Sequence, residues 1–155
     1  MAVFVSLGGS FLNAQTIKDG FGQKTLLDGS VYHGEFKNGL FNGEGTLTYA
    51  NGDRYEGRFR QGQFNGYGVM DFADHRQYIG GFKDGLFDGK GALIYVDSSK
   101  YEGQFKKGRL NGKGSLTYSD GKQYKGEFKD GEIYVAPAPD ASGWIAANTN
   151  GKAGK

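Results

Sequence analysis

Apolar and polar residues alternate along most of the chain with a period of two, and the pattern recurs every 23 residues. In one unit, Tyr55, Gly57 and Phe59 alternate with charged residues, and the alternation resumes from Gly68 to Phe72. A period of two places successive side chains on opposite faces of a β-strand. Each unit is therefore predicted to be a β-hairpin with one aromatic face and one polar face.

Five copies of the unit stand in register. Each opens on a tyrosine, has glycine at its third and eighth positions and phenylalanine at its fifth, and the opening residues are Tyr32, Tyr55, Tyr78, Tyr101 and Tyr124. A fixed period of this length indicates a repeat array, whose stability comes from the stacking of neighbouring units. The predicted fold class is all-β: an elongated, curved, single-layer array of antiparallel hairpins with about ten strands.

The repeat pattern also divides the chain into segments. The array is predicted over residues 21–135, preceded by an N-terminal cap or signal-like segment (1–20) and followed by a flexible tail (136–155). Within the array we predict a half repeat at 21–31, repeats at 32–54, 55–77, 78–100 and 101–123, and a partial repeat at 124–135.

Glycines inside the strands call for an explanation, because glycine weakens a strand unless another group approaches its bare backbone. We expect rings from neighbouring strands to lie over these glycines, as in aromatic rescue. A single sheet has no second layer, so the aromatic face is predicted to form a partly wet groove that binds a protein or peptide partner. Phe59 and Phe82 are expected only to stabilise the sheet; the predicted groove-binding residues are Tyr55, Tyr78, Tyr95 and Phe72.

A second candidate surface is a row of cations. The sixth position of every repeat is basic, and its occupants are Lys37, Arg60, Lys83, Lys106 and Lys129. Two strands per repeat would place these cations roughly 10 Å apart along the sheet. An anionic membrane attracts each by about 1 kcal/mol, so the row supplies at most about 5 kcal/mol. The alternative is a solubilising polar face that carries no binding function.

The two ends leave alternatives open. The apolar stretch of residues 2–12 is either a cap on the first repeat or the remnant of a secretory signal ending near Ala14. The tail is expected to be a mobile end, or else to dock Trp144 on the last repeat as a cap. A cytoplasmic or membrane-peripheral location is favoured, and a secreted one if residues 1–14 are a signal remnant.

Composition narrows the function classes. The formal net charge is +2 with both signs mixed, so no nucleic-acid partner is expected. The chain has no cysteine, which excludes disulfides and thiolate metal sites. No apolar run approaches the roughly 18–20 residues of a membrane-spanning helix. The sequence does not predict an oligomeric state.

No constellation of residues indicates catalysis. The only histidines, His33 and His75, occupy slots that other copies fill with different residues, so they are predicted to be surface or turn residues. Recurring carboxylates fall on solvent-facing positions, and no spacing suits a metal ion or a nucleotide phosphate. We therefore expect no enzymatic activity, no metal and no cofactor.

The units Tyr55-Glu56-Gly57-Arg58-Phe59 and Asn65-Gly66-Tyr67-Gly68 closely resemble MORN (membrane occupation and recognition nexus) repeats. The resemblance covers roughly three quarters of the chain. It implies a curved array of β-hairpins that serves as a platform for protein interaction or membrane association. Such repeats also accompany the catalytic domains of some phosphatidylinositol phosphate kinases and of a SET-type lysine methyltransferase.

Several functions stay open at this level. The chain is predicted to be a non-catalytic scaffold for a protein partner, with a peripheral module for anionic phospholipid as the alternative. It could also be the targeting domain of a kinase or methyltransferase whose catalytic part is absent here. An extracellular glycan binder is disfavoured, because the only tryptophan, Trp144, lies outside the repeats.

Overall fold

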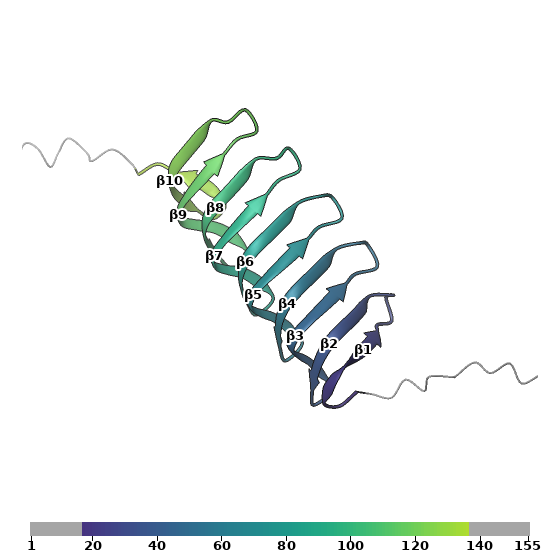
Figure 1. The fold of residues 1–155 in the computed structure, drawn as a ribbon. Helices are drawn as coiled ribbons and strands as arrows, with labels where there is room; N and C mark the ends of the chain where they lie inside the picture. The colour runs from purple at the N-terminus through teal and green to yellow at the C-terminus, as the bar shows by residue number, and fades with distance from the viewer. Residues whose placement is uncertain (1–16, 137–155) are drawn as a thin grey trace, which may run out of the picture.

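The computed structural model describes residues 17–136, and within this range eleven antiparallel strands form one open sheet in chain order, without a helix. Figure 1 shows hairpin stacked on hairpin along the array, with β1 and β10 at opposite ends. The strands are β1 (Gly20–Thr25), β2 (Val31–Lys37), β3 (Leu40–Thr48), β4 (Arg54–Arg60), β5 (Gln63–Asp71), β6 (Gln77–Lys83), β7 (Leu86–Ile94), β8 (Lys100–Lys106), β9 (Arg109–Thr117), β10 (Gln123–Lys129) and β11 (Glu132–Tyr134). The predicted all-β array is confirmed, with one strand more than expected.

A two-residue turn closes each hairpin. Between β2 and β3, Asn38 has a φ of 52° and Gly39 a φ of 76°. Positive φ at both central residues defines a type I′ turn, whose twist matches that of the flanking strands. The second strand therefore begins at Leu40, directly after the turn.

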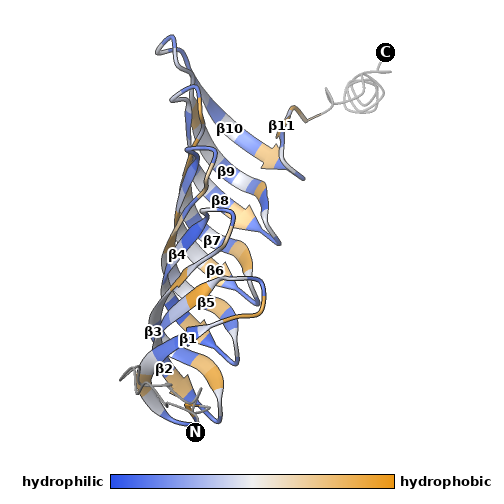
Figure 2. Ribbon diagram, turned by 90° about the vertical axis from the view of Figure 1, so that its right-hand side faces the viewer, coloured by the Kyte–Doolittle hydropathy of each residue, from blue (hydrophilic) through white to orange (hydrophobic). Residues whose placement is uncertain are grey.

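Each hairpin is bent by an irregularity in its strand pairing. In the β2–β3 pair, Gly34 faces Gly45 while Phe36 faces Phe41, so Glu35 alone opposes three residues of β3. The same shift recurs in the pairs β4–β5, β6–β7 and β8–β9. Extra residues on one strand bend it and increase its twist. Figure 2 shows the hairpins bending to one side along the whole array.

The core lies inside this bend. The ring of Tyr32, near the start of β2, stacks on the ring of Phe41, near the start of β3, with centroids 3.7 Å apart. The edge of Phe59, from the next repeat, meets Tyr32 at 4.9 Å. Both arrangements are favourable aromatic geometries. Because the contacts recur, one aromatic core passes from repeat to repeat, and four tyrosines in it are fully buried: Tyr32, Tyr55, Tyr78 and Tyr101.

The expected packing of rings over glycines is confirmed. A Cβ added to Gly68 would lie 2.7 Å from the Tyr55 ring, which covers the backbone of both Gly68 and Gly57. The Tyr55 hydroxyl donates a hydrogen bond of 2.8 Å to the carbonyl of Arg58, the residue at the pairing irregularity. The tyrosine thus fills the bend with its ring and satisfies the backbone there with its hydroxyl.

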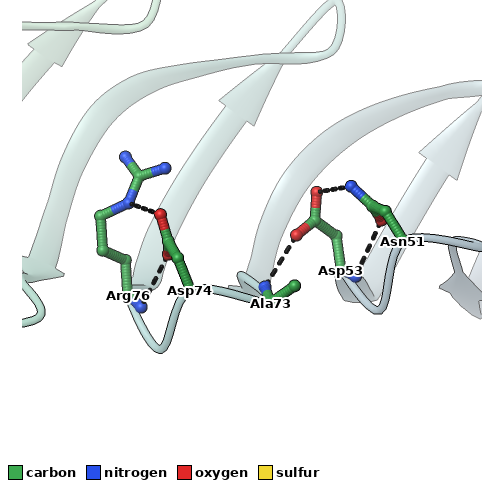
Figure 3. Close-up of polar contacts among 5 residues, drawn as sticks. All are labelled: Asn51, Asp53, Ala73, Asp74 and Arg76. Carbon is green, nitrogen blue, oxygen red and sulfur yellow. Dashed lines mark hydrogen bonds and ion pairs between the residues drawn. The ribbon is translucent and has the colours of Figure 1, made fainter.

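The turns between repeats are held by short polar side chains (Figure 3). Asn51 accepts a hydrogen bond from the Asp53 amide, and Asp53 accepts one of 2.8 Å from the Ala73 amide in the next turn. Asp74 accepts bonds from the backbone and the guanidinium of Arg76. The bond from the Arg76 amide is the main reason why the pKa of Asp74 lies below its usual value. Consecutive turns are therefore linked directly.

At the N-terminal end, Ile17 lies over Gly22, where the other repeats place a tyrosine. In β1, which overlaps the half repeat predicted at 21–31, Gly22 faces Gly34 as Gly45 faces Gly57. The predictions for residues 1–16, and those for the tail beyond Ala136, lie outside the described residues.

The ring-over-glycine packing predicts that Gly91→Ala destabilises the protein more than Lys90→Ala. A Cβ at Gly91 would lie 2.5 Å from the Tyr78 hydroxyl oxygen, whereas Lys90 is exposed. Overpacking of this kind typically costs about 1–3 kcal/mol in the free energy of unfolding. Denaturant unfolding measures both variants, and equal effects would contradict the packing.

Stability is also expected to fall at alkaline pH. Burial raises the pKa of Tyr32 from 10.0 to about 12. A raised pKa in the folded state favours the neutral hydroxyl, so this contribution is complete below about pH 10 and is lost as pH rises through about 12. Urea melts across this range should show the loss, and Tyr32→Phe should flatten the pH dependence. A wild-type stability that is constant across the range would contradict the burial of the tyrosines.

Candidate binding surfaces

The structure corrects the predicted aromatic groove. Tyr55 and Tyr78, expected to be reachable by a partner, both have 0% exposure. The reason is the bend in each hairpin, which folds the aromatic face onto itself and stacks Phe64 against Tyr55 at 3.8 Å. Phe59 and Phe82 are also buried, and serve the sheet as expected. These four rings form the core and do not line a groove.

Phe72 and Tyr95 lie next to the turns between repeats, a region that we call the mouth of the bend. Both side chains are only partly buried there. The guanidinium of Arg76 sits 4.5 Å from the centre of the Phe72 ring, in a cation–π contact. Burial raises the pKa of Tyr95. Tyr49 and Tyr118, one repeat before Phe72 and one after Tyr95, hold the same slot; the 23-residue period could have identified them.

Near the last repeats lies a largely apolar hollow of about 470 Å³. We call it the C-terminal hollow, and its apolar lining comprises Tyr95, Val96, Leu110, Leu116, Tyr118, Phe128 and Ile133. Three of these side chains are more than a third exposed: Val96 at 63%, Tyr118 at 42% and Ile133 at 39%. The volume lies in the range of small-ligand pockets, about 300–1,000 Å³.

The predicted cations lie together on the other face of the hairpins, and all are exposed. We call them the hairpin-tip row: Lys37, Arg60, Lys83, Lys106 and Lys129. Each is the last residue of its strand, next to the type I′ turn, and follows a phenylalanine that points into the core. Strand alternation therefore forces the cation outward.

Two features of this surface were missed by sequence reasoning. Leu40 and Leu86, directly across the strand pair from Lys37 and Lys83, are each 49% exposed. In the fourth repeat, Lys107 and Arg109 join the row around a pocket shared with Lys106 and Lys129. The signal was present, because residues 104–113 contain four basic residues and no acidic one.

The residues weighed for chemistry occupy the surface. His33 is exposed and its ring meets the edge of Phe21 at 4.7 Å, and His75 sits in a turn with a φ of 71°. Within residues 17–136 there is no cluster of three or more residues that could hold a metal ion. Nor does that range contain a helix long and apolar enough to cross a membrane.

The chain is a β-hairpin repeat protein. Its bent hairpins recur in register every 23 residues, and in each full repeat a tyrosine ring covers a pair of facing glycines. The family model for the MORN repeat matches residues 32–54, 55–75, 78–100, 101–123 and 124–133. The chain therefore belongs to the MORN repeat family. No curated protein matches it. MORN repeats occur in proteins of interaction and membrane association, and their all-β fold is typically non-catalytic.

The correction of the groove yields a test. Tyr55→Ser should destabilise the fold strongly, because truncating a buried aromatic side chain costs about 3–5 kcal/mol. Tyr95→Ser should cost clearly less, since Tyr95 is only partly buried at the mouth. Thermal and denaturant melts of the two variants decide the point, and a Tyr55 variant as stable as wild type would contradict the assignment of its ring to the core.

Proposed function

We propose that this MORN array is a non-catalytic scaffold that associates with an anionic membrane surface through its hairpin tips. The observation that carries the proposal is the alignment of five exposed cations at the hairpin tips. Five cations elsewhere in the described array are ion-paired, for example Arg58 with Glu44 at 3.0 Å and Lys100 with Glu102 at 2.9 Å, and others such as Lys90 are not. Within residues 17–136 no cation of the row forms an ion pair. Five exposed positive charges are thus held in a line across the ends of five strands, and Lys129 also lies 5.5 Å from the centre of the Tyr134 ring.

Electrostatic attraction alone would hold the protein weakly. Each cation near an anionic surface contributes about 1 kcal/mol, and salt screens exposed charges over about 8 Å. Neighbouring carboxylates at Asp84, Asp130 and Glu132 reduce the total. Stable peripheral binding normally takes a second contribution besides charge.

The exposed leucines supply that contribution. Leu40 and Leu86 stand beside Lys37 and Lys83 at the tips, so the same edge presents both apolar and cationic side chains. Burying the exposed half of a leucine adds about 1 kcal/mol each, from the usual value for full burial. Lysine stems next to them can bury their methylenes while the charge stays at the headgroups. The combination favours a lipid interface over a purely polar partner.

The fourth repeat is the strongest part of this surface. Lys106, Lys107 and Arg109 lie around one pocket with Lys129, and Asp130 is the only carboxylate lining it. Pairing across the strands places Arg109 opposite Lys106. We expect the C-terminal half of the row to bind an anionic headgroup more tightly than the N-terminal half.

The test is flotation with vesicles of neutral phosphatidylcholine, with and without an anionic phospholipid. Replacing the five row residues by glutamine should abolish binding and leave the fold intact, because every replaced side chain is exposed. The control variant changes five cations outside the hairpin tips, with the same change in net charge: Lys24, Arg54, Lys100, Lys122 and Lys125.

Two outcomes would overturn the proposal. One is a wild-type protein that does not float with anionic vesicles, which would leave an acidic protein surface as the partner for the row. The other is an equal loss in both five-residue variants, which would show an effect of net charge without a specific face. High salt screens the charges, so the binding that remains there depends mainly on the apolar contribution. The double variant Leu40→Ser and Leu86→Ser should therefore bind more weakly than wild type at high salt.

A further inference from the structure

Two residues that line the C-terminal hollow, Leu110 and Ile133, stand where other repeats have a phenylalanine ring. In three repeats a phenylalanine stacks on the tyrosine of the same hairpin: Phe41, Phe64 and Phe87, at 3.7–3.8 Å. One period on, the slot holds Leu110, and one further it holds Ile133. An aliphatic side chain does not stack on the tyrosine as a flat ring does, and both Leu110 and Ile133 line the hollow.

Among residues 17–136, no further repeat covers this end. Each inner tyrosine receives the phenylalanine of the following repeat, as Tyr101 receives Phe128 at 4.8 Å. Tyr124 opens the last copy and is only partly buried. The repeat pattern of the sequence stops after Val135, where two prolines follow at Pro137 and Pro139. Residues 136–155 therefore do not supply another repeat.

We propose that Trp144, from the C-terminal tail, occupies the C-terminal hollow and caps the array. Trp144 and Ile145 are the only large apolar residues after Val135. Trp144 lies eight positions after Ala136, a reach of about 26–29 Å when the chain is extended. Ile133 itself lines the hollow, only three residues before Ala136, so the tail starts beside the site.

The chemistry of the hollow suits an indole. Its walls are mainly apolar, with the partly exposed side chains of Tyr118 and Ile133 available for contact. Arg76, which also lines the hollow, already lies over one aromatic ring, and tryptophan is the best partner for such a cation. Asp97 and Ser99 complete the lining and can accept a hydrogen bond from the indole N–H. Repeat arrays require a terminal unit that covers the last core surface, and Trp144 meets this need.

The experiment uses the full chain and its single tryptophan, so intrinsic fluorescence reports on Trp144 alone. Folded wild-type protein should show blue-shifted emission and acrylamide quenching several-fold weaker than the urea-unfolded chain. Leu110→Phe combined with Ile133→Phe should refill the stacking slot and expel the indole. Emission should then shift to that of the unfolded chain, while the protein remains folded by circular dichroism.

A matched control lies at the other end of the array, where Leu40→Ser alters an exposed leucine and should leave Trp144 fluorescence unchanged. Wild-type quenching equal to that of the unfolded chain would overturn the proposal. So would protection that survives the refilled slot, or that follows the Leu40 variant. Protection that disappears on dilution, together with a dimer in sedimentation, would place the indole in a second copy and would also overturn it.

Discussion

The packing of one tyrosine ring over a pair of facing glycines underlies the whole structure. Tyr55 covers Gly57 on its own strand and Gly68 on the next, and a methyl group on either would collide with the ring or with backbone. Its hydroxyl donates a hydrogen bond to the Arg58 carbonyl, which lies at the irregularity in the hydrogen-bonded pairing of β4 with β5. One side chain therefore fixes both the bend and the spacing of the strands. The high glycine content follows from this contact.

The bend explains how a single sheet acquires a core. A flat sheet would leave its aromatic face in water, whereas here each hairpin folds that face inward. The next repeat adds its phenylalanine edge to the tyrosine before it, so every unit finishes the burial of its neighbour. Stability thus arises between units as much as within them, as expected for repeat proteins. It also leaves the polar face and the hairpin tips free to vary.

The core positions therefore determine the fold, and the outer positions are available for binding. Core positions are filled by the same residue types in nearly every copy, while the outer positions differ in charge and size. The tips of the fourth repeat carry Lys106, Lys107 and Arg109, whereas the first carries Lys37 and Leu40. The ends differ as well: Ile17 covers Gly22 at the start, and the last repeats have an open hollow. Functional differences along the array are therefore expected at the tips and at the end.

The sequence by itself determined the period, the hairpins, the all-β class and the exposure of the cation row. These follow from local rules, because alternation assigns the faces of a strand and glycine after Asn38 or its equivalents allows the turn. Only the tertiary structure decided that Tyr55 and Tyr78 are buried. Alternation shows which residues share a face, but not whether that face folds onto itself. The fold-over depends on the pairing shift opposite Glu35, which is set by contacts across strands. The C-terminal hollow likewise brings together side chains of three repeats, such as Tyr95, Leu116 and Ile133, which no local pattern records.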